Sequence, residues 1–426
     1  MPYTHQQFAR LRKRIARIER KFAAAKTPSM PASRISHESS ARWFIEEWSE
    51  GQVIRNEFGE HFQTERLFAG HKPHGSADVG ALADLPHDLL DGLGENHIPA
   101  TAPHRWAFLD TETTGLLGSP GTYAFLVGIG RITSDGFRVR QFFMREYREE
   151  RSVLAAVEAH LNQFDVLVTY NGKSYDEPLL ESRYCMMRQK SPFGTLCHLD
   201  LLHGSRRLWK LRLESCRLMQ LEQQILGVYR EGDLAGEMIP YVYFEYLRSR
   251  EAHRLVPIFH HNAMDILTLA CLMAIVPIAF RSADSESLAR VGVRRGEDIV
   301  GVARWLLAAE QHEHALTLFK CAVEAGLPDS ILFRVLWHVA LLEKKLQRPH
   351  AAVPVFTEIA GCRNDYRVRA LEELAKHYEH EEKKYGVALE FTNEALQYAP
   401  SSALSQRKMR LERRVGKASE TIQFRR

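Results

Sequence analysis

The order of strand and helix signals between residues 104 and 190 constrains the fold more than any other feature of this sequence. Turns that contain glycine separate three apolar stretches of strand character, at residues 106–109, 123–132 and 137–144. The chain then alternates, with helical spacing over 151–164, strand spacing over 166–170 and helical spacing over 176–188. Three successive strands followed by such alternation predict an α/β domain, in which helices flank a mixed sheet.

A second region, beyond about residue 285, shows only helical spacing. Three short stretches resemble one another, and their alanines Ala315, Ala352 and Ala388 lie 37 and 36 residues apart. This period is close to the roughly 34-residue tetratricopeptide unit, in which small residues let paired helices approach closely. We therefore predict an all-α helical-repeat domain, with an unrelated helical bundle as the alternative.

Both ends of the chain are basic. Residues 1–26 combine an apolar stripe at helical spacing with eight basic residues against one acid, which predicts an amphipathic helix that either docks by its stripe or binds phosphates. Strand-like alternation around 56–59 predicts a hairpin. The sequence thus divides into a basic helix and linker (1–33), a hairpin and loop region (34–103), the α/β domain (104–282), the helical repeats (290–403) and a basic tail (404–426).

Composition excludes several classes of protein. The 57 basic and 53 acidic residues leave a net charge of only +4, so overall charge does not by itself indicate a nucleic-acid partner. The six cysteines include no CxxC pair, which is typical of free thiols in a reducing compartment. The longest apolar run, 266–280, contains Pro277 and is shorter than the roughly 18 residues of a membrane span. We expect a cytoplasmic protein that does not contact membranes.

Two carboxylates stand at the end of the first strand of the α/β domain. Asp110 and Glu112 are two residues apart, so in a strand their side chains lie on the same face. Such a pair repels unless a cation lies between its members, and hard divalent ions prefer oxygen ligands. Gly115 allows the chain to turn close to a ligand. This Asp-x-Glu pattern is weak alone, and the Thr-Thr-Gly that follows strengthens it.

Two further acids occupy positions where a structural role is the simpler interpretation. Asp176 opens a predicted helix after the strand that ends near Asn171, and an aspartate there is commonly an N-cap. Asp265 lies in a very apolar helix, where a buried carboxylate needs a partner or a metal. His261 precedes Asp265 by four residues and shares its helix face, whereas His260 lies further round the helix.

Taken together, these motifs resemble the DEDD exonucleases of the ribonuclease H-like superfamily. The strings 171–180 (NGKSYDEPLL) and 261–266 (HNAMDI) are similar to the narrower YprB-type ribonuclease H-like domain, over roughly residues 104–280. Proteins of this type often carry a tetratricopeptide-like C-terminal region. The resemblance implies a ribonuclease H-like sheet and a metal-dependent 3′→5′ exonuclease that hydrolyses phosphodiester bonds of single-stranded DNA or RNA ends.

The resemblance also implies roles for individual residues. Two Mg²⁺ or Mn²⁺ ions would be held by four carboxylates, namely Asp110, Glu112, Asp176 and Asp265. A histidine would serve as general base, and the two subgroups of the family place it at His260 or at His261. We favour His261 because the local His-Asn-x-x-Asp string matches the narrower group.

Substrate contacts are expected from residues that flank the acids. By resemblance, the 3′-terminal nucleotide would contact Thr113, Gly115, Leu116, Asn171 and Tyr175, although loop packing also explains Leu116 and a core position explains Tyr175. The basic run Arg206, Arg207, Lys210 and Arg212 suits phosphates and equally a solvated helix face. The alternatives to an exonuclease are a nucleic-acid-binding scaffold with weak or no catalysis, whose repeats recruit a protein partner, and a metal-dependent endonuclease.

Overall fold

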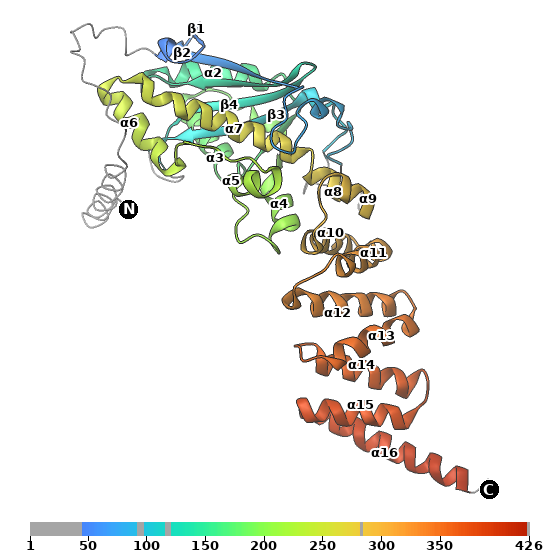
Figure 1. The fold of residues 1–426 in the computed structure, drawn as a ribbon. Coiled ribbons are helices and arrows are strands. Elements are labelled where there is room, and N and C mark those ends of the chain that lie inside the picture. Colours follow the sequence, from blue (N-terminus) through green and yellow to red (C-terminus); the bar gives the residue numbers. More distant parts are fainter. Residues whose placement is uncertain (1–44, 92–97, 116–120, 282–283, 424–426) are drawn as a thin grey trace, which may run out of the picture. The chain divides into compact units, whose positions relative to one another are not determined.

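The computed structural model describes residues 45–91, 98–115, 121–281 and 284–423, and its α/β part is built on a mixed sheet of seven strands (Figure 1). The strands are β1 (Gln52–Asn56), β2 (Gly59–Ala69), β3 (Trp106–Thr113), β4 (Ala124–Thr133), β5 (Gly136–Phe143), β6 (Val166–Thr169) and β7 (Cys197–Asp200). Their order in the sheet is β1-β2-β5-β4-β3-β6-β7. The mixed sheet expected from the sequence is therefore confirmed, with β7 as a strand that the sequence did not reveal.

Strand direction changes at β3. All pairs from β1 to β3 are antiparallel, whereas β3–β6 and β6–β7 are parallel. The predicted hairpin joins β1 to β2, where Asn56 faces Gly59 and its side chain accepts a hydrogen bond from the Phe58 N–H (3.0 Å). Because β2 pairs with β5, this hairpin extends the central sheet and is not separate from it.

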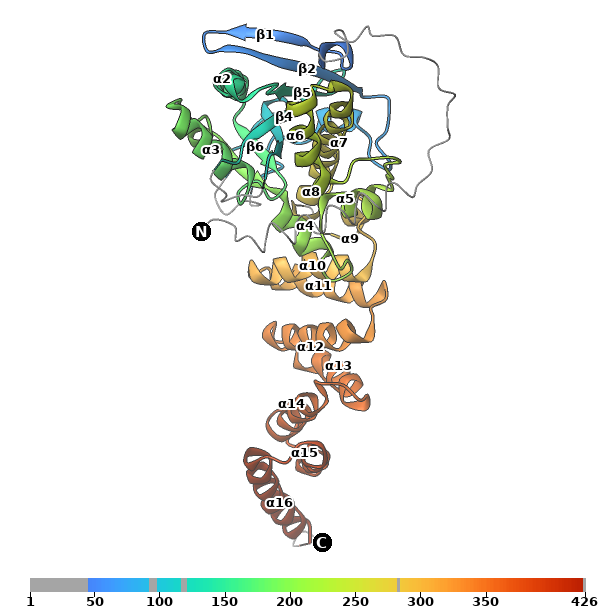
Figure 2. The same cartoon turned by 90° about the vertical axis from the view of Figure 1, so that its left-hand side faces the viewer.

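Helices cover both faces of the sheet. The helices of this part are α2 (Glu150–Leu161), α3 (Asp176–Met187), α4 (Leu201–Trp209), α5 (Leu218–Leu221), α6 (Ile239–Ser249), α7 (Val256–Met273) and α8 (Val276–Arg281). Phe108 packs with the body of α7 on one face, while the next residue, Leu109, packs with α2 and α3 on the other. Figure 2 shows α2 and α7 on opposite sides of the strands.

Two glycines on β4 allow α7 to lie unusually close to the sheet. A Cβ atom on Gly128 would lie 2.2 Å from Oδ1 of Asn262 and 2.4 Å from Ile266, and one on Gly130 would lie 2.6 Å from Ile266. No side chain fits between β4 and α7 at these positions. This contact brings the polar face of α7 next to the carboxylates of β3.

The chain continues as a series of helices. These are α9 (Ser285–Arg290), α10 (Gly296–Ala308), α11 (His312–Glu324), α12 (Asp329–Lys345), α13 (Pro349–Gly361), α14 (Arg367–His380), α15 (Tyr385–Tyr398) and α16 (Ser402–Gln423). Ala315, Ala352 and Ala388 are the fourth residues of α11, α13 and α15 and are all buried. The helical C-terminal region is confirmed, with small residues at equivalent helix contacts.

The ends of the chain differ in what is seen of them. The expected basic helix and linker at 1–33 lie outside the described residues. The basic tail begins inside α16, where Arg407 and Arg410 pair with the buried Glu379 (both 2.7–2.8 Å). These two arginines are therefore used within the protein.

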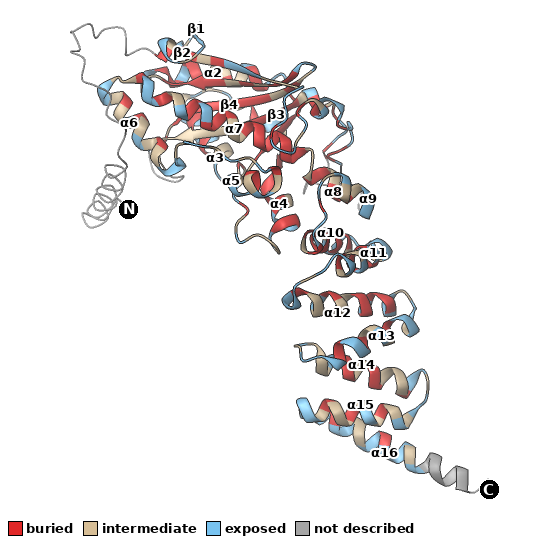
Figure 3. Ribbon diagram, in the orientation of Figure 1, coloured by how far each residue is buried: buried red, intermediate tan, exposed pale blue. Residues whose placement is uncertain are grey.

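One described helical stretch, Ala252–Arg281, is long and apolar enough to cross a membrane by length and composition alone. Of its most apolar window, 72% is buried inside the protein. Figure 3 colours much of α7 as buried. A core helix passes the same test, and this one packs on β3, β4 and β5.

Candidate active site

Four carboxylates meet where β3, α3 and α7 adjoin. Asp110 and Glu112 come from β3, Asp176 is the first residue of α3, and Asp265 lies in the middle of α7. Burial raises the pKa of Glu112 well above its ordinary value, and the negative charges of Asp110, Asp265 and Asp176 raise it further. The structure thus brings together acids that are scattered over 156 positions of the chain, between residues 110 and 265.

Asp110 lies at the centre of this group. Burial and the neighbouring Asp265 and Asp176 raise its pKa well above the ordinary value. Its Oδ2 accepts a hydrogen bond from Nδ2 of Asn262 (2.8 Å), which reaches it across Gly128. A neutral amide donor orients this carboxylate but does not balance its charge.

Asp176 does not act as the N-cap that its position suggested. Helix α3 starts at Asp176 itself, and no side chain caps that end. Its Oδ1 accepts a hydrogen bond from the hydroxyl of Thr111 (2.5 Å), the residue between the two β3 acids. Burial raises the pKa of Asp176 to about 6, against the effect of this hydrogen bond.

Asp265 has a partner that the sequence did not reveal. The guanidinium of Arg230 lies 2.7 Å from its Oδ1 and also pairs with Glu222 (2.8 Å) and Asp233 (3.3 Å). Burial raises the pKa of Asp265, while the neighbouring His261 and Arg230 oppose that shift. Asp265 is therefore the one member of the four whose charge an arginine balances among the described residues.

The two candidate histidines point to different surroundings. His261 is buried, with Nδ1 at 2.9 Å from Oδ2 of Asp233 and Nε2 at 3.6 Å from Oδ2 of Asp265. His260 is exposed, and its Nδ1 lies 3.1 Å from Arg66 on β2. A carboxylate accepts hydrogen bonds, so Asp233 holds the proton of His261 on Nδ1 and leaves Nε2 free to accept one.

A cavity of about 260 Å³ opens beside the acids. Its walls include Asp110 and Asp176 but not Glu112 or Asp265. Four of the five expected substrate contacts line the same cavity, namely Thr113, Gly115, Asn171 and Tyr175. The fifth, Leu116, lies outside the described residues.

The wall formed by the loop after β6 has a fixed shape. Asn171 adopts a left-handed backbone (φ 67°), and the buried Asp200 accepts hydrogen bonds from the backbone N–H of Asn171 (2.8 Å) and of Lys173 (3.3 Å). Tyr175 projects from this loop with half of its surface exposed. An exposed aromatic ring beside a polar cavity is available for stacking against a base.

The donor set suits hard divalent cations. Its acidic members offer only carboxylate oxygens, and among the described residues Asp110, Glu112 and Asp176 have no cationic side chain as an ion-pair partner. Burial, and after it the excess of negative charge, raises the pKa values of Asp110 and Glu112, and a cation would relieve the repulsion. The ligand atoms are still spread out, since no three of the four acids bring them within 4.8 Å of one another in the described part of the chain.

Sequence reasoning missed the residues that support the site. Arg230 and Asp233 lie in a loop without regular spacing, and nothing in that loop pointed to the carboxylates. Asn262 lies inside the string 261–266, which carries the resemblance without giving this residue a role, and Glu222 lies between the two strings. Thr111 was visible only as the residue between two acids.

Comparison with known proteins identifies the family of this chain. Residues 107–276 match the family model of the RNase H superfamily, a span that contains the four carboxylates and both candidate histidines. The chain is 33% identical over 296 residues to YprB of Bacillus subtilis strain 168, and the match covers 68% of each chain. The chain therefore belongs to the ribonuclease H-like superfamily, whose members are generally nucleases that use divalent metal ions, and within it to the family of YprB.

Proposed function

We propose that this protein is a divalent-metal-dependent 3′→5′ exonuclease acting on single-stranded nucleic acid in the cytoplasm. The observation that carries the proposal is the convergence of Asp110, Glu112, Asp176 and Asp265 beside His261 and an open cavity. Six free cysteines in the described residues support a reducing compartment.

The metal ions would be held by four carboxylates, those of Asp110, Glu112, Asp176 and Asp265. When bound, a pair of Mg²⁺ or Mn²⁺ ions supplies charge neutralisation at the phosphodiester and lowers the pKa of water. For Asp265, a metal must compete with the Arg230 guanidinium at 2.7 Å. Asn262 keeps the Asp110 carboxylate aimed into the site throughout.

His261 is the general base in this proposal. Its Nε2 faces the site at 3.6 Å from Asp265, and Asp233 at 2.9 Å fixes the ring and its tautomer. The carboxylate of Asp233 also stabilises the imidazolium that forms when Nε2 takes a proton from the attacking water. Asp233 is thus a positioning residue. His260, which faces Arg66, takes no part.

The cavity beside Asp110 would receive the terminal nucleotide. Thr113 and Gly115 line it from the end of β3 and just after it, and Asn171 and Tyr175 line it from the loop after β6. Tyr175 offers a stacking surface for a base without sequence preference. A pocket of about 260 Å³ suits a single nucleotide better than a duplex, which supports action on an unpaired end.

The test is digestion of an end-labelled single-stranded oligonucleotide with Mg²⁺ or Mn²⁺. We expect stepwise shortening from the 3′ end, abolished by EDTA and by Asp110→Asn. A 3′-phosphorothioate block or a circular substrate distinguishes an exonuclease from an endonuclease. Cleavage of the circle would identify an endonuclease and contradict the proposal.

One observation favours the scaffold alternative. Arg230 neutralises Asp265 without a metal, so the site can be partly balanced as a non-catalytic binding surface. In that case the wild-type protein would bind single strands in EDTA as tightly as in Mg²⁺ and would not shorten them. The helical region would then act by recruiting a protein partner.

A further inference from the structure

A second, larger cavity adjoins the candidate active site. It has a volume of about 590 Å³ and lies between α4, the loop after it and the start of α5. Tyr170 and Asn171 line this cavity and also the 260 Å³ cavity that contains Asp110 and Asp176. The two hollows therefore share a wall, and a chain leaving one can enter the other.

Three cations face this second cavity. Arg206 and Lys210 are one helical turn apart at the end of α4, and Arg217 comes from the loop that leads to α5. All three are exposed, and within the described ranges none of them forms an ion pair with a carboxylate. The side-chain Nζ of Lys210 donates to the backbone carbonyl of Glu214 (2.5 Å). One acid, Glu214, also lines the cavity, so its walls carry three positive charges and one negative.

The structure separates the members of the basic run that the sequence displays there. Arg212 is used internally, since it pairs with the buried Asp298 of α10 (2.9 Å). Arg207 is exposed on α4 but does not line the cavity. Three cations therefore remain available to bind a ligand in this cavity, namely Arg206, Lys210 and Arg217. Exposed and unpaired cations along a groove bind a run of phosphates, whatever the base sequence.

We propose that this groove, defined by Arg206, Lys210 and Arg217, holds the phosphates of a single strand whose end lies in the Asp110 cavity. The inference rests on the proposed function and adds to it the path of the strand. The order of contacts follows from the shared wall: terminal nucleotide at Asp110, then Asn171, then the cationic groove. The ligand class is single-stranded nucleic acid of several nucleotides.

The experiment compares a long and a short substrate with the full-length protein. The long substrate is a fluorescent single-stranded oligonucleotide, and the short one is the p-nitrophenyl ester of thymidine 5′-monophosphate, which is too small to reach the groove. The test variant is Arg206→Gln/Lys210→Gln/Arg217→Gln, and Arg207→Gln is the control on the same helix.

For the triple variant we expect weaker binding of the oligonucleotide by tenfold or more at low salt. The slope of log Kd against log salt should fall by about 2, because each lost phosphate contact removes about 0.7 for a single strand. Hydrolysis of the short ester should stay within twofold of wild type, and Arg207→Gln should change the oligonucleotide affinity by less than twofold. Each single glutamine variant should lower the slope by about 0.7.

Other results have separate meanings. Unchanged oligonucleotide affinity and slope in the triple variant would overturn the groove, while hydrolysis by wild type would leave the exonuclease standing. Equal loss on the short and long substrates would also overturn it, since the cations would then act on the active site itself. Groove-dependent binding without any hydrolysis would support the groove and refute the exonuclease.

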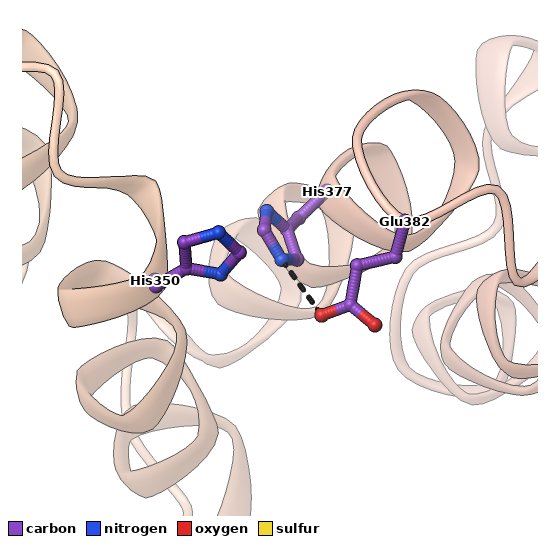
Figure 4. Close-up of side chains that lie close together, drawn as sticks. All are labelled: His350, His377 and Glu382. Carbon is purple, nitrogen blue, oxygen red and sulfur yellow. Dashed lines mark hydrogen bonds and ion pairs between the residues drawn. The ribbon is translucent and has the colours of Figure 1, made fainter.

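A different observation carries a second site, in the helical region. His350 in the first turn of α13, His377 in the last turn of α14 and Glu382 just after α14 each place one ligand atom within 4.8 Å of the others. Figure 4 shows the two imidazoles and the carboxylate converging. The rings meet edge to face at 5.7 Å, and Nε2 of His377 lies 3.2 Å from Oε1 of Glu382.

The two oxygens of Glu382 have different partners. Oε1 faces His377, whereas Oε2 pairs with Lys384 (2.6 Å), so the lysine orients the carboxylate and leaves Oε1 available. Two imidazoles and a carboxylate form the ligand set of an open Zn²⁺ site, with solvent at the fourth position. We infer that Zn²⁺ binds here and links α13 to the α14–α15 turn.

The test uses the metal-stripped full-length protein in the Asp110→Asn background, which weakens the other candidate metal site. We expect Zn²⁺ to raise the thermal unfolding midpoint by about 2–4 °C, and Co²⁺ to give the visible absorption of a four-coordinate site. His350→Ala should abolish both signals, while His380→Ala, on the same surface, should keep them. The same signals in His350→Ala as in its parent, or none in the parent, would overturn the site.

Discussion

Asp110 shows in a single residue the charge repulsion that is present throughout the site. It is partly buried among like charges, and its carboxylate accepts a hydrogen bond from the neutral amide of Asn262. Such a group is unfavourable for folding and favourable for cation binding, because a cation relieves the repulsion that burial strengthens. We therefore expect the carboxylate cluster to lower the stability of the metal-free protein, and bound cations to raise the stability of the protein.

Asp110→Asn tests this balance. In EDTA we expect the variant to be more stable than wild type, because the substitution removes a carboxylate whose charge is made unfavourable by burial and by the neighbouring Asp265 and Asp176. Mg²⁺ should raise the unfolding midpoint of wild type and not that of the variant. Urea unfolding followed by circular dichroism measures both, and a variant less stable than wild type in EDTA would contradict the argument.

His61 gives the protein a pH dependence outside the site. It is fully buried with Nδ1 at 2.8 Å from the Ser152 hydroxyl, and burial together with the charge of Arg145 lowers its pKa to about 4. The unfolded chain takes up a proton below about 6.5 while the folded chain does not, so stability is lost as pH falls from about 6.5 towards 4.

His61→Gln should flatten that dependence. Between pH 7 and pH 5 we expect wild type to lose about 2 kcal/mol of unfolding free energy through this residue, and the variant to lose correspondingly less. Urea unfolding at the two pH values makes the comparison. His87→Gln, at an exposed position, is the control and should behave as wild type. Parallel pH profiles for wild type and His61→Gln would exclude this residue as the source.

At the scale of elements, the site depends on how closely α7 approaches β4. Gly128 pairs with Asp110 across the ladder, and Asn262 of α7 crosses over it to reach that carboxylate. The bulge at Glu112 and Thr113 ends the regular pairing where the cavity opens. Strand and helix thus deliver acids from both sides of one small contact.

Gly128→Ala should separate these elements. The new Cβ would overlap Asn262 at 2.2 Å and Ile266 at 2.4 Å, so we expect a loss of about 1–3 kcal/mol and a marked fall in nuclease activity. Gly386→Ala in α15, where nothing lies within 4 Å, is the matched control and should be neutral or slightly stabilising. If both variants behaved alike, close approach would not be what Gly128 provides.

At the scale of the whole molecule, α4 connects the two halves of the described chain. One side of this helix presents cations to the groove, and its end contacts α10. A Cβ on Gly301 of α10 would lie 2.3 Å from the carbonyl oxygen of Arg207. Beside this contact, Arg212 pairs with Asp298, which is 2% exposed. The helical region is thereby joined to the nuclease-type domain by packing and by a partly buried ion pair.

Asp298→Ala should weaken that junction. Removing one partner leaves the Arg212 charge half-buried and unpaired, and we expect a loss near the lower end of about 3–5 kcal/mol. Faster hydrogen exchange in α4 and α10 would locate the effect. Glu286→Ala breaks an exposed pair with Arg290 and should cost less than about 1 kcal/mol. Equal effects of the two substitutions would show that burial adds nothing to the Asp298 pair.

Much of the fold follows from local sequence. Periodicity within about ten residues can be read directly from the sequence. It predicts the run of three strands before β6, the β1–β2 hairpin and the helices beyond residue 285. Strand β7 was not predicted, because its four residues are too few to show a periodic pattern. The sequence did not predict that β1 and β2 belong to the central sheet, because pairing between strands far apart in the chain leaves no local signal.

The candidate site divides along the same line. The sequence by itself determined the chemistry available: four acids and a histidine at spacings that put Asp110 with Glu112 and His261 with Asp265. Only the tertiary structure decided which groups share charge, because Arg230 and Asp233 reach the site from an irregular loop and Asn262 reaches it across a glycine. Periodicity acts along the chain, whereas electrostatic pairing acts through space, and only the folded chain brings the two together.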